Sequence, residues 1–142
     1  MDMKKLLIVL ASALVLTACG SYHIGTGSGP SPSTNPGLGF AVAVSEKDHA
    51  ATLHVGQKLE VVLHANNGMN NWTQPKSSDA SILAAVVNPA ATAVRGVTLA
   101  AFQALAPGSA QITATAGADC SPGQPCPQYL MVLTITVTVV AP

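Results

Sequence analysis

Between residues 40 and 140, apolar and polar residues alternate in short runs that are separated by turn residues. Successive side chains of a β-strand point to opposite faces, so a period of two is typical of strands with one buried face. The pattern predicts strands at residues 40–44, 51–55, 58–64, 70–74, 81–87, 97–104, 109–116 and 130–140. A helical period never lasts longer than a turn or two, and we therefore expect an all-β domain.

Three of these strands indicate which side chains face the core. The inward residues are Leu59, Val61 and Leu63, then Ala110, Ile112 and Ala114, and last Leu133, Ile135, Val137 and Val139. An immunoglobulin-like antiparallel β-sandwich of about seven to eight strands fits this pattern best. The alanine-rich stretch 84–93 favours helix by propensity, but Asn88-Pro89 interrupts it.

The first 18 residues follow a different pattern. Lys4 and Lys5 precede an apolar run at 6–15, and about ten residues are too few to span about 30 Å of hydrocarbon. The next residues, Leu16-Thr17-Ala18-Cys19-Gly20, resemble the bacterial lipobox. We therefore expect residues 1–18 to be a lipoprotein signal peptide and Cys19 to receive the lipid. An ordinary secretory signal followed by a coincidental cysteine is the alternative.

The lipobox resemblance implies a protein that a lipid anchors to a membrane outside the cytoplasm. Two acyl chains suffice for stable anchoring, since each buried methylene contributes about 0.8 kcal/mol. Gly20 in place of Asp after Cys19 favours the outer membrane in a Gram-negative envelope. In a Gram-positive envelope the protein would lie on the outer face of the plasma membrane. Residues 19–39 are rich in Gly, Ser, Pro and Thr and predict a disordered tether, which leaves 40–142 as the domain.

Several short motifs of the domain, in a fixed order, resemble bacterial immunoglobulin-like surface domains. They are Val55-Gly56-Gln57-Lys58-Leu59, Trp72, Ser77-Ser78-Asp79, Phe102-Gln103-Ala104 and Gly108-Ser109-Ala110-Gln111-Ile112-Thr113-Ala114. The resemblance covers most of residues 55–140 and implies a sandwich that spaces or displays binding surfaces. In this class of sandwich a tryptophan on the third strand usually fills the core, so a core position is favoured for Trp72 over an exposed one.

The cysteines lie where the chain departs from that pattern, in residues 117–129. With Cys19 assigned to the lipid, Cys120 and Cys126 remain as a pair in an exported chain. Pro122, Gly123 and Pro125 turn the chain between them, and we predict a disulfide that stabilises by roughly 2 kcal/mol. The spacing does not match a Cys-x-x-Cys redox motif, and zinc would need about four ligands. We predict no metal site.

Two loops form the candidate binding surface. In an immunoglobulin-type sandwich the last loop lies at the same end as the loop after the second core strand, which here means residues 120–129 and 66–72. The candidate residues are Asn66, Asn67, Gly68, Met69, Trp72, Pro122, Gln124, Pro125 and Tyr129. A loop ordered in advance by a disulfide loses less entropy on binding. Stabilisation of a long hairpin is the other interpretation of the disulfide.

Two functions without catalysis compete. The first is a surface binding or structural module whose partner is a protein or a glycan of the cell envelope. The second is an inhibitor of cysteine proteases, because Asn66-Asn67-Gly68-Met69-Asn70-Asn71-Trp72 resembles in outline the first loop of chagasin-type inhibitors. That family has Asn-Pro-Thr-Thr-Gly before an aromatic segment, so the proline and both threonines are missing here. The resemblance implies that loops 65–72 and 117–129 enter a papain-like cleft.

The chagasin resemblance is incomplete in the other two loops. The family's Arg-Pro-Trp segment belongs in the last loop, where this chain has Gln124-Pro125-Cys126. A glycine-rich middle loop is not evident in the sequence.

Charge and motif content argue against nucleic-acid binding and catalysis. After residue 18 the chain has four positive and five negative side chains, a net charge of about −1, which gives no electrostatic reason to bind nucleic acid. The candidate bases in the domain are His49, His54 and His64, and we interpret them as surface residues. We find no nucleophile elbow, zinc-protease motif or phosphate loop. We therefore predict no enzymatic activity and no cofactor.

Overall fold

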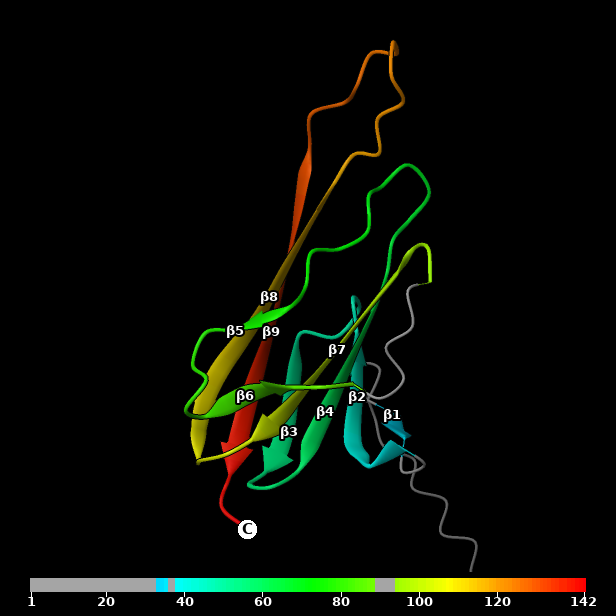
Figure 1. Cartoon of the computed structure of the whole chain (residues 1–142). Coiled ribbons are helices and arrows are strands. Elements are labelled where there is room, and N and C mark those ends of the chain that lie inside the picture. Colours follow the sequence, from blue (N-terminus) through cyan, green and yellow to red (C-terminus); the bar gives the residue numbers. More distant parts are fainter. Residues whose placement is uncertain (1–32, 36–37, 89–93) are drawn as a thin grey trace, which may run out of the picture.

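The computed structural model describes residues 33–35, 38–88 and 94–142, which form two β-sheets packed face to face (Figure 1). The first sheet has the strand order β1-β2-β4-β7-β6, with β1 Ser33–Asn35, β2 Phe40–Ser45, β4 Lys58–His64, β7 Val97–Ala104 and β6 Leu83–Val86. The second has the order β3-β9-β8-β5, with β3 Ala50–His54, β9 Leu130–Val140, β8 Gly108–Gly117 and β5 Lys76–Ser77. The described residues contain no α-helix, so the predicted all-β sandwich is confirmed.

A membrane-crossing helix is not found in the described part of the chain, where every regular element is a strand. The predicted signal peptide, Cys19 and most of the predicted tether lie outside the described residues, as do residues 89–93 of the alanine-rich stretch. Within the predicted tether, Ser33–Asn35 forms β1 and pairs antiparallel with β2, Ser33 opposite Ala43 and Asn35 opposite Phe40. These three residues therefore add a strand to the first sheet, although they precede the predicted start of the domain at residue 40.

Most predicted strands agree with the structure to within two residues at each end, but the predicted strand at 70–74 was wrong. These residues run beside β8 without forming a strand. The Thr73 amide donates to the Thr115 carbonyl over 2.8 Å, while the Thr115 amide donates to the Thr73 hydroxyl over 2.9 Å. A side-chain hydroxyl thus replaces a backbone acceptor of the ladder. Pro75, which has no amide proton, follows, and regular pairing is limited to the two residues of β5.

Two strand pairs differ from the antiparallel arrangement expected from the sequence. β2 pairs parallel with β4, and β3 pairs parallel with β9. The cause is that β2, β3 and β4 alternate between the sheets, so the chain passes through β3 of the second sheet before it returns to lie beside β2. The remaining pairs are antiparallel.

The core lies between the two sheets. Every residue predicted to face inward on β4, β8 and β9 is buried, and Phe102 of β7 is 1% exposed. Trp72 is 6% exposed, and its indole Nε1 donates to the carbonyl oxygen of His64 over 3.0 Å. The core position predicted for Trp72 is confirmed. Its hydrogen bond satisfies the polar end of the ring, as a buried indole requires.

Candidate functional site

Three connections gather at one end of the sandwich (Figure 1). They are the β4–β5 loop at 65–75, the β6–β7 connection at 87–96, of which 89–93 lie outside the described residues, and the β8–β9 loop at 118–129. They meet there because β4 and β6 both run antiparallel to β7, and β8 starts from the far end of β7. We call this region the three-loop end.

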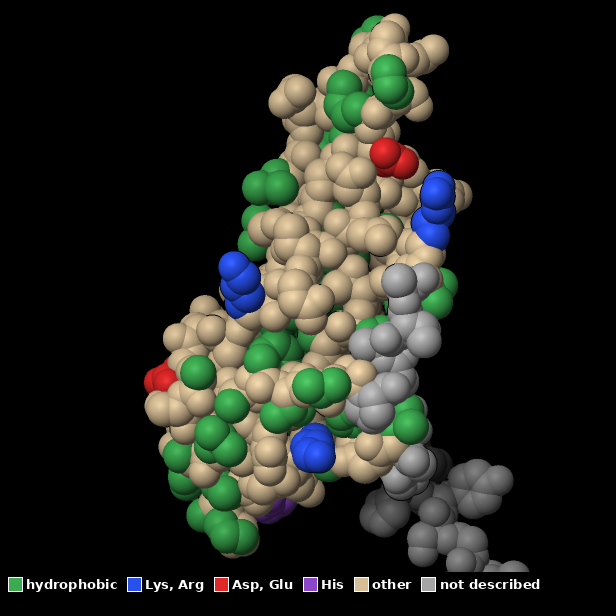
Figure 2. Space-filling model, in the orientation of Figure 1, with side chains coloured by type: hydrophobic (Ala, Val, Ile, Leu, Met, Phe, Trp, Pro, Cys, Tyr) green, Lys and Arg blue, Asp and Glu red, His purple; other side chains and the backbone are tan. Residues whose placement is uncertain are grey.

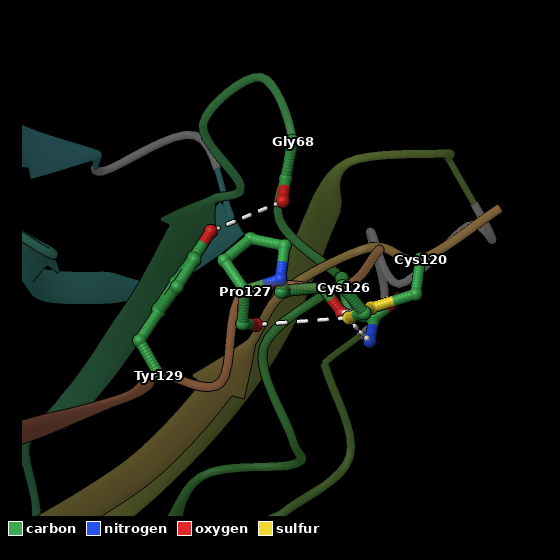
Figure 3. Close-up of a disulfide and its surroundings, with 7 residues drawn as sticks. Gly68, Cys120, Cys126, Pro127 and Tyr129 are labelled. Carbon is green, nitrogen blue, oxygen red and sulfur yellow. Dashed lines mark hydrogen bonds between the residues drawn. A yellow bond between two sulfur atoms is a disulfide. The ribbon is translucent and has the colours of Figure 1, made fainter. Parts of the chain in front are cut away.

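The β4–β5 loop is bonded to the β8–β9 loop through Gly68. The Gly68 carbonyl oxygen accepts from the Tyr129 hydroxyl over 3.0 Å (Figure 3). It also accepts from the Asp119 amide over 2.9 Å. The φ angle of Gly68 is 82°, a left-handed conformation that glycine adopts without steric cost. Asn70 adds a further bond from its side-chain amide to the Ala118 carbonyl over 2.9 Å. The two loops predicted as binding surface therefore do meet.

The same β4–β5 loop is bonded on its other side to the β6–β7 connection. The Gly96 amide donates to Oδ1 of Asn71 over 3.0 Å, and the Ala65 amide donates to the Gly96 carbonyl over 2.8 Å. The Thr98 hydroxyl donates to the Trp72 carbonyl over 2.9 Å. The β4–β5 loop is therefore the middle member of three joined loops.

Two of the predicted binding residues support the loop and offer little surface to a partner. Met69 is 9% exposed and forms an isolated β-bridge with Ala118. Trp72, at 6% exposed, lies in the core beneath the loop. Asn66, Asn67 and Gly68 are exposed, so these three predicted residues are accessible to a partner.

The disulfide between Cys120 and Cys126 is present, as predicted, with the two Cα atoms 5.5 Å apart (Figure 3). Pro122, Gln124 and Pro125 are exposed between the cysteines, in the part of the hairpin that projects farthest from the sandwich in Figure 1. Tyr129, by contrast, lies against Gly68. The structure thus brings Tyr129 to the β4–β5 loop and places the other three residues on the projecting tip.

An open hollow of about 630 Å³ lies at the three-loop end and is lined by residues 65–71, Arg95, Gly96 and Asp119. Asn70, Asn71 and Asp119 lie within the predicted loops 65–72 and 117–129 but were not among the individual candidate residues, whereas Arg95 and Gly96 lie outside both predicted loops. Asn70 and Asn71 were also assigned to the predicted strand at 70–74. Nothing in the local sequence links Arg95-Gly96 to the other loops. The sequence did contain a signal for Asp119 itself. It is the last charged residue of the chain and lies next to Cys120.

The three histidines of the predicted domain, His49, His54 and His64, are exposed, as the sequence predicted. His64 Nδ1 lies 3.4 Å from Oε2 of Glu46, and His54 Nδ1 lies 2.9 Å from the Ala141 carbonyl oxygen. Partial burial raises the pKa of Glu46, but hydrogen bonds from its own amide and from His64 outweigh burial and hold that pKa below its ordinary value of 4.5. In the described part of the chain, no three His, Cys, Asp or Glu residues gather as metal ligands.

Comparison with known proteins gives a distant likeness in fold. No protein-family model matches the chain, and no curated protein matches it in sequence. Among solved structures, the cysteine protease inhibitor EhICP2 from Entamoeba histolytica is 18% identical with a TM-score of 0.47, and the likeness covers 69% of this chain and 93% of that one. The solution structure of amebosin is 17% identical with a TM-score of 0.41, covering 69% and 96%. Both likenesses are too remote to decide function.

Proposed function

We propose that this protein inhibits papain-like cysteine proteases by inserting the three-loop end into the active-site cleft. The observation that carries the proposal is the pair of contacts made by the β4–β5 loop, which is hydrogen-bonded through Gly68 to one neighbouring loop and through Asn71 to the other. Three joined loops at one end form a single preformed edge. A spacer or simple display module, the other function considered from the sequence, has no need of such cross-bonding.

Preorganisation matters for this function in two ways. A loop that is already ordered loses little entropy when it binds. The acceptor at Gly68, which takes two hydrogen bonds, also resists the distortion that a protease needs to align a peptide bond for cleavage. A cross-bonded loop therefore binds in the cleft as an inhibitor and is a poor substrate.

The resemblance of residues 66–72 to the first chagasin-type loop supports the choice of cysteine proteases. Asn66, Asn67 and Gly68 are exposed and available for contact, whereas Trp72 is buried. The aromatic contact of that family is therefore not offered by Trp72. We assign the direct contacts to Asn66 to Gly68, to the flanking Arg95 and Asp119, and to the tip residues Pro122, Gln124 and Pro125.

We also propose that the inhibitor is exported and anchored outside the cytoplasm through a lipid on Cys19. This part of the proposal rests on the sequence of residues 1–20 alone. An anchored inhibitor would act on proteases that reach the cell envelope. Intact-mass measurement of the membrane-extracted protein tests the anchor, because loss of residues 1–18 together with a diacylglycerol adduct is expected. A mass that matches an unmodified Cys19 would overturn it.

The inhibitory function is tested by titrating papain with the purified chain. Wild type is expected to inhibit, and Asn67→Arg is expected to weaken inhibition by about tenfold or more, because it changes an exposed residue of the middle loop. Ser109→Arg is the matched control, since Ser109 is exposed near the start of β8, at the opposite end of the sandwich. Absence of inhibition at high micromolar concentration, or equal loss in both variants, would remove the proposal.

A further inference from the structure

One edge of β9 is only partly covered by a neighbouring strand. On one side β9 pairs with β8 from Leu130 opposite Gly117 to Val139 opposite Gly108. On the other side β3 pairs only with residues 136–140. Within residues 33–35, 38–88 and 94–142, no strand therefore pairs with the outer edge of residues 130–135, which we call the free edge. Figure 1 shows this part of the β8–β9 hairpin projecting beyond the sandwich.

The hydrogen bonds of β8 show which backbone groups of β9 point to the free edge. The N–H and C=O of Thr115 are both bonded to Thr73, on the side of β8 away from β9. In an antiparallel ladder the residue opposite, Val132, then directs its own N–H and C=O away from β8. Leu130 and Thr134, two positions away in either direction, also direct their N–H and C=O away from β8.

Two further bonds confirm this orientation along the strand. The Gly117 carbonyl, opposite Leu130, accepts from the Asn70 amide over 3.0 Å. At the covered end of the same edge, the Thr136 amide donates to the His49 carbonyl over 2.9 Å. The amide and carbonyl groups of alternate residues 130, 132 and 134 thus form an open half of a β-ladder.

The free edge carries exposed apolar side chains and no charge. Leu130 is 67% exposed, Met131 42% and Val132 65%. The sequence from Cys120 to Pro142 contains no Asp, Glu, Lys, Arg or His, and Figure 2 shows no charged side chain at the tip of the projecting hairpin on the face drawn. Natural sheet edges are usually protected by charged residues, proline or a bulge. Residues 130–135 of β9 contain neither a charged residue nor a proline.

We propose that the free edge binds a short, extended and uncharged peptide segment of a partner protein by strand addition. Backbone bonds to Leu130, Val132 and Thr134 supply affinity, and apolar side chains at alternate positions of the segment contact Leu130 and Val132. The segment is short because β3 occupies the same edge from Thr136 onward. Residues 130–135 span roughly 20 Å, enough for about six extended residues.

A second copy of this chain fits the free edge less well than a short segment. Suppose that two free edges paired antiparallel about a two-fold axis. The β3 strand of the second copy would then lie end to end with β9 of the first copy and collide with the β8–β9 loop of that first copy. The inference is independent of protease inhibition, because it depends only on the backbone and apolar side chains of β9. Its test therefore uses a peptide and no protease.

The probe is an acetylated, amidated peptide of sequence Val-Thr-Val-Thr-Val-Thr, titrated into the full chain. Binding is expected to protect the amides of Leu130, Val132 and Thr134 from hydrogen exchange, while those of Met131 and Leu133, already bonded to β8, change little. The control peptide is N-methylated at alternate residues, which removes the donors but keeps the apolar surface. It is expected not to bind.

Two variants and one matched control test the site on the protein. Val132→Pro removes a donor that faces the free edge and leaves the β8 ladder bonds intact. Val132→Lys adds a charge to the same edge. Both are expected to weaken peptide binding by about tenfold or more, whereas Val87→Lys, at a residue 90% exposed just after β6, leaves it unchanged. If the proline variant loosens the hairpin, the lysine variant still decides the test.

Three results would overturn the inference. The first is no peptide binding to wild type at millimolar concentration. The second is equal binding of the N-methylated peptide, which would indicate apolar adhesion without strand addition. The third is a wild-type dimer in sedimentation that Val132→Lys dissociates, because a second copy would then be the occupant of the free edge.

Discussion

The hydroxyl of Tyr129 donates a hydrogen bond to the carbonyl oxygen of Gly68 over 3.0 Å, across 61 positions of sequence (Figure 3). This bond fixes the start of β9 against the middle loop of the three-loop end. The Gly68 carbonyl takes a second bond from the Asp119 amide, so both ends of the β8–β9 loop are attached to one oxygen atom. The relative position of the two loops is therefore set by Gly68.

Tyr129→Phe is expected to weaken papain inhibition without unfolding the domain. The change removes one hydrogen bond, with a net contribution of about 0.5–1.5 kcal/mol, or roughly threefold to tenfold in the inhibition constant. Tyr129 is 42% exposed, and the bond from Asp119 still satisfies the Gly68 carbonyl. The melting temperature should therefore change little. Inhibition equal to wild type would show that this bond does not organise the binding surface.

Removal of the disulfide is expected to act on binding more than on the sandwich. The variant Cys120→Ser/Cys126→Ser releases a loop that projects beyond the core, and on the chain-entropy model the bond contributes roughly 2 kcal/mol. We expect inhibition of papain to weaken by about tenfold or more, because the tip residues must then be ordered on binding. The double serine variant is preferable to a reductant, since a cysteine protease itself responds to reducing agents.

A measurement of the fold of the double serine variant is the control for the disulfide prediction. Far-ultraviolet circular dichroism of the double serine variant should match wild type, because the core residues of β8 and β9 lie between the sheets and not in the loop. A variant that inhibits papain as strongly as wild type would assign the disulfide a purely stabilising role. This is the alternative that the sequence left open.

The strands of the core could be predicted closely because their periodicity is strict. β4 and β9 begin and end where the alternation of Leu59, Val61 and Leu63 and of Leu133, Ile135 and Val137 indicates. The direction of pairing could not be predicted, since alternation is the same in parallel and antiparallel pairs. β2 and β3 therefore gave no sign that they pair parallel with β4 and β9.

The candidate site was predicted only where fold analogy extends. The analogy placed residues 66–72 and 120–129 at one end, and the Gly68 contacts confirm that these loops meet. It favoured a core position for Trp72, which is confirmed, but it gave no indication that Met69 is buried. The contribution of Gly96 depends on long-range bonds to Ala65 and Asn71. No local pattern encodes such bonds.

Trp72→Phe is expected to destabilise the whole domain. The substitution leaves the His64 carbonyl without its indole donor and opens a small cavity between the sheets, at a combined cost of about 2 kcal/mol in the free energy of unfolding. Urea unfolding followed by circular dichroism measures the change, since Trp72 is the only tryptophan and its fluorescence is lost. A loss below about 0.5 kcal/mol would contradict a structural role for the ring.

The stability of the domain is expected to fall in acid, partly through Glu46. Burial raises the pKa of this carboxyl, but hydrogen bonds from its own amide and from the amide and ring of His64 lower it by more than burial raises it. The pKa of Glu46 therefore lies below 4.5. A folded pKa below the unfolded one means that the charged form stabilises the native state. The contribution is complete above the unfolded pKa and is lost as the pH falls through the folded pKa.

Glu46→Gln separates this contribution from other acidic groups. The free energy of unfolding of wild type should exceed that of the variant above pH 4.5, and the difference should shrink on further acidification, because glutamine does not titrate. Asp79→Asn serves as the comparison, since hydrogen bonds from the Ser81 hydroxyl and amide lower the pKa of Asp79 at an exposed turn far from His64. If the two differences vary identically with pH, the contact with His64 has no specific effect. A difference confined to Glu46 would show that this contact stabilises the end of β4, where the three-loop end begins.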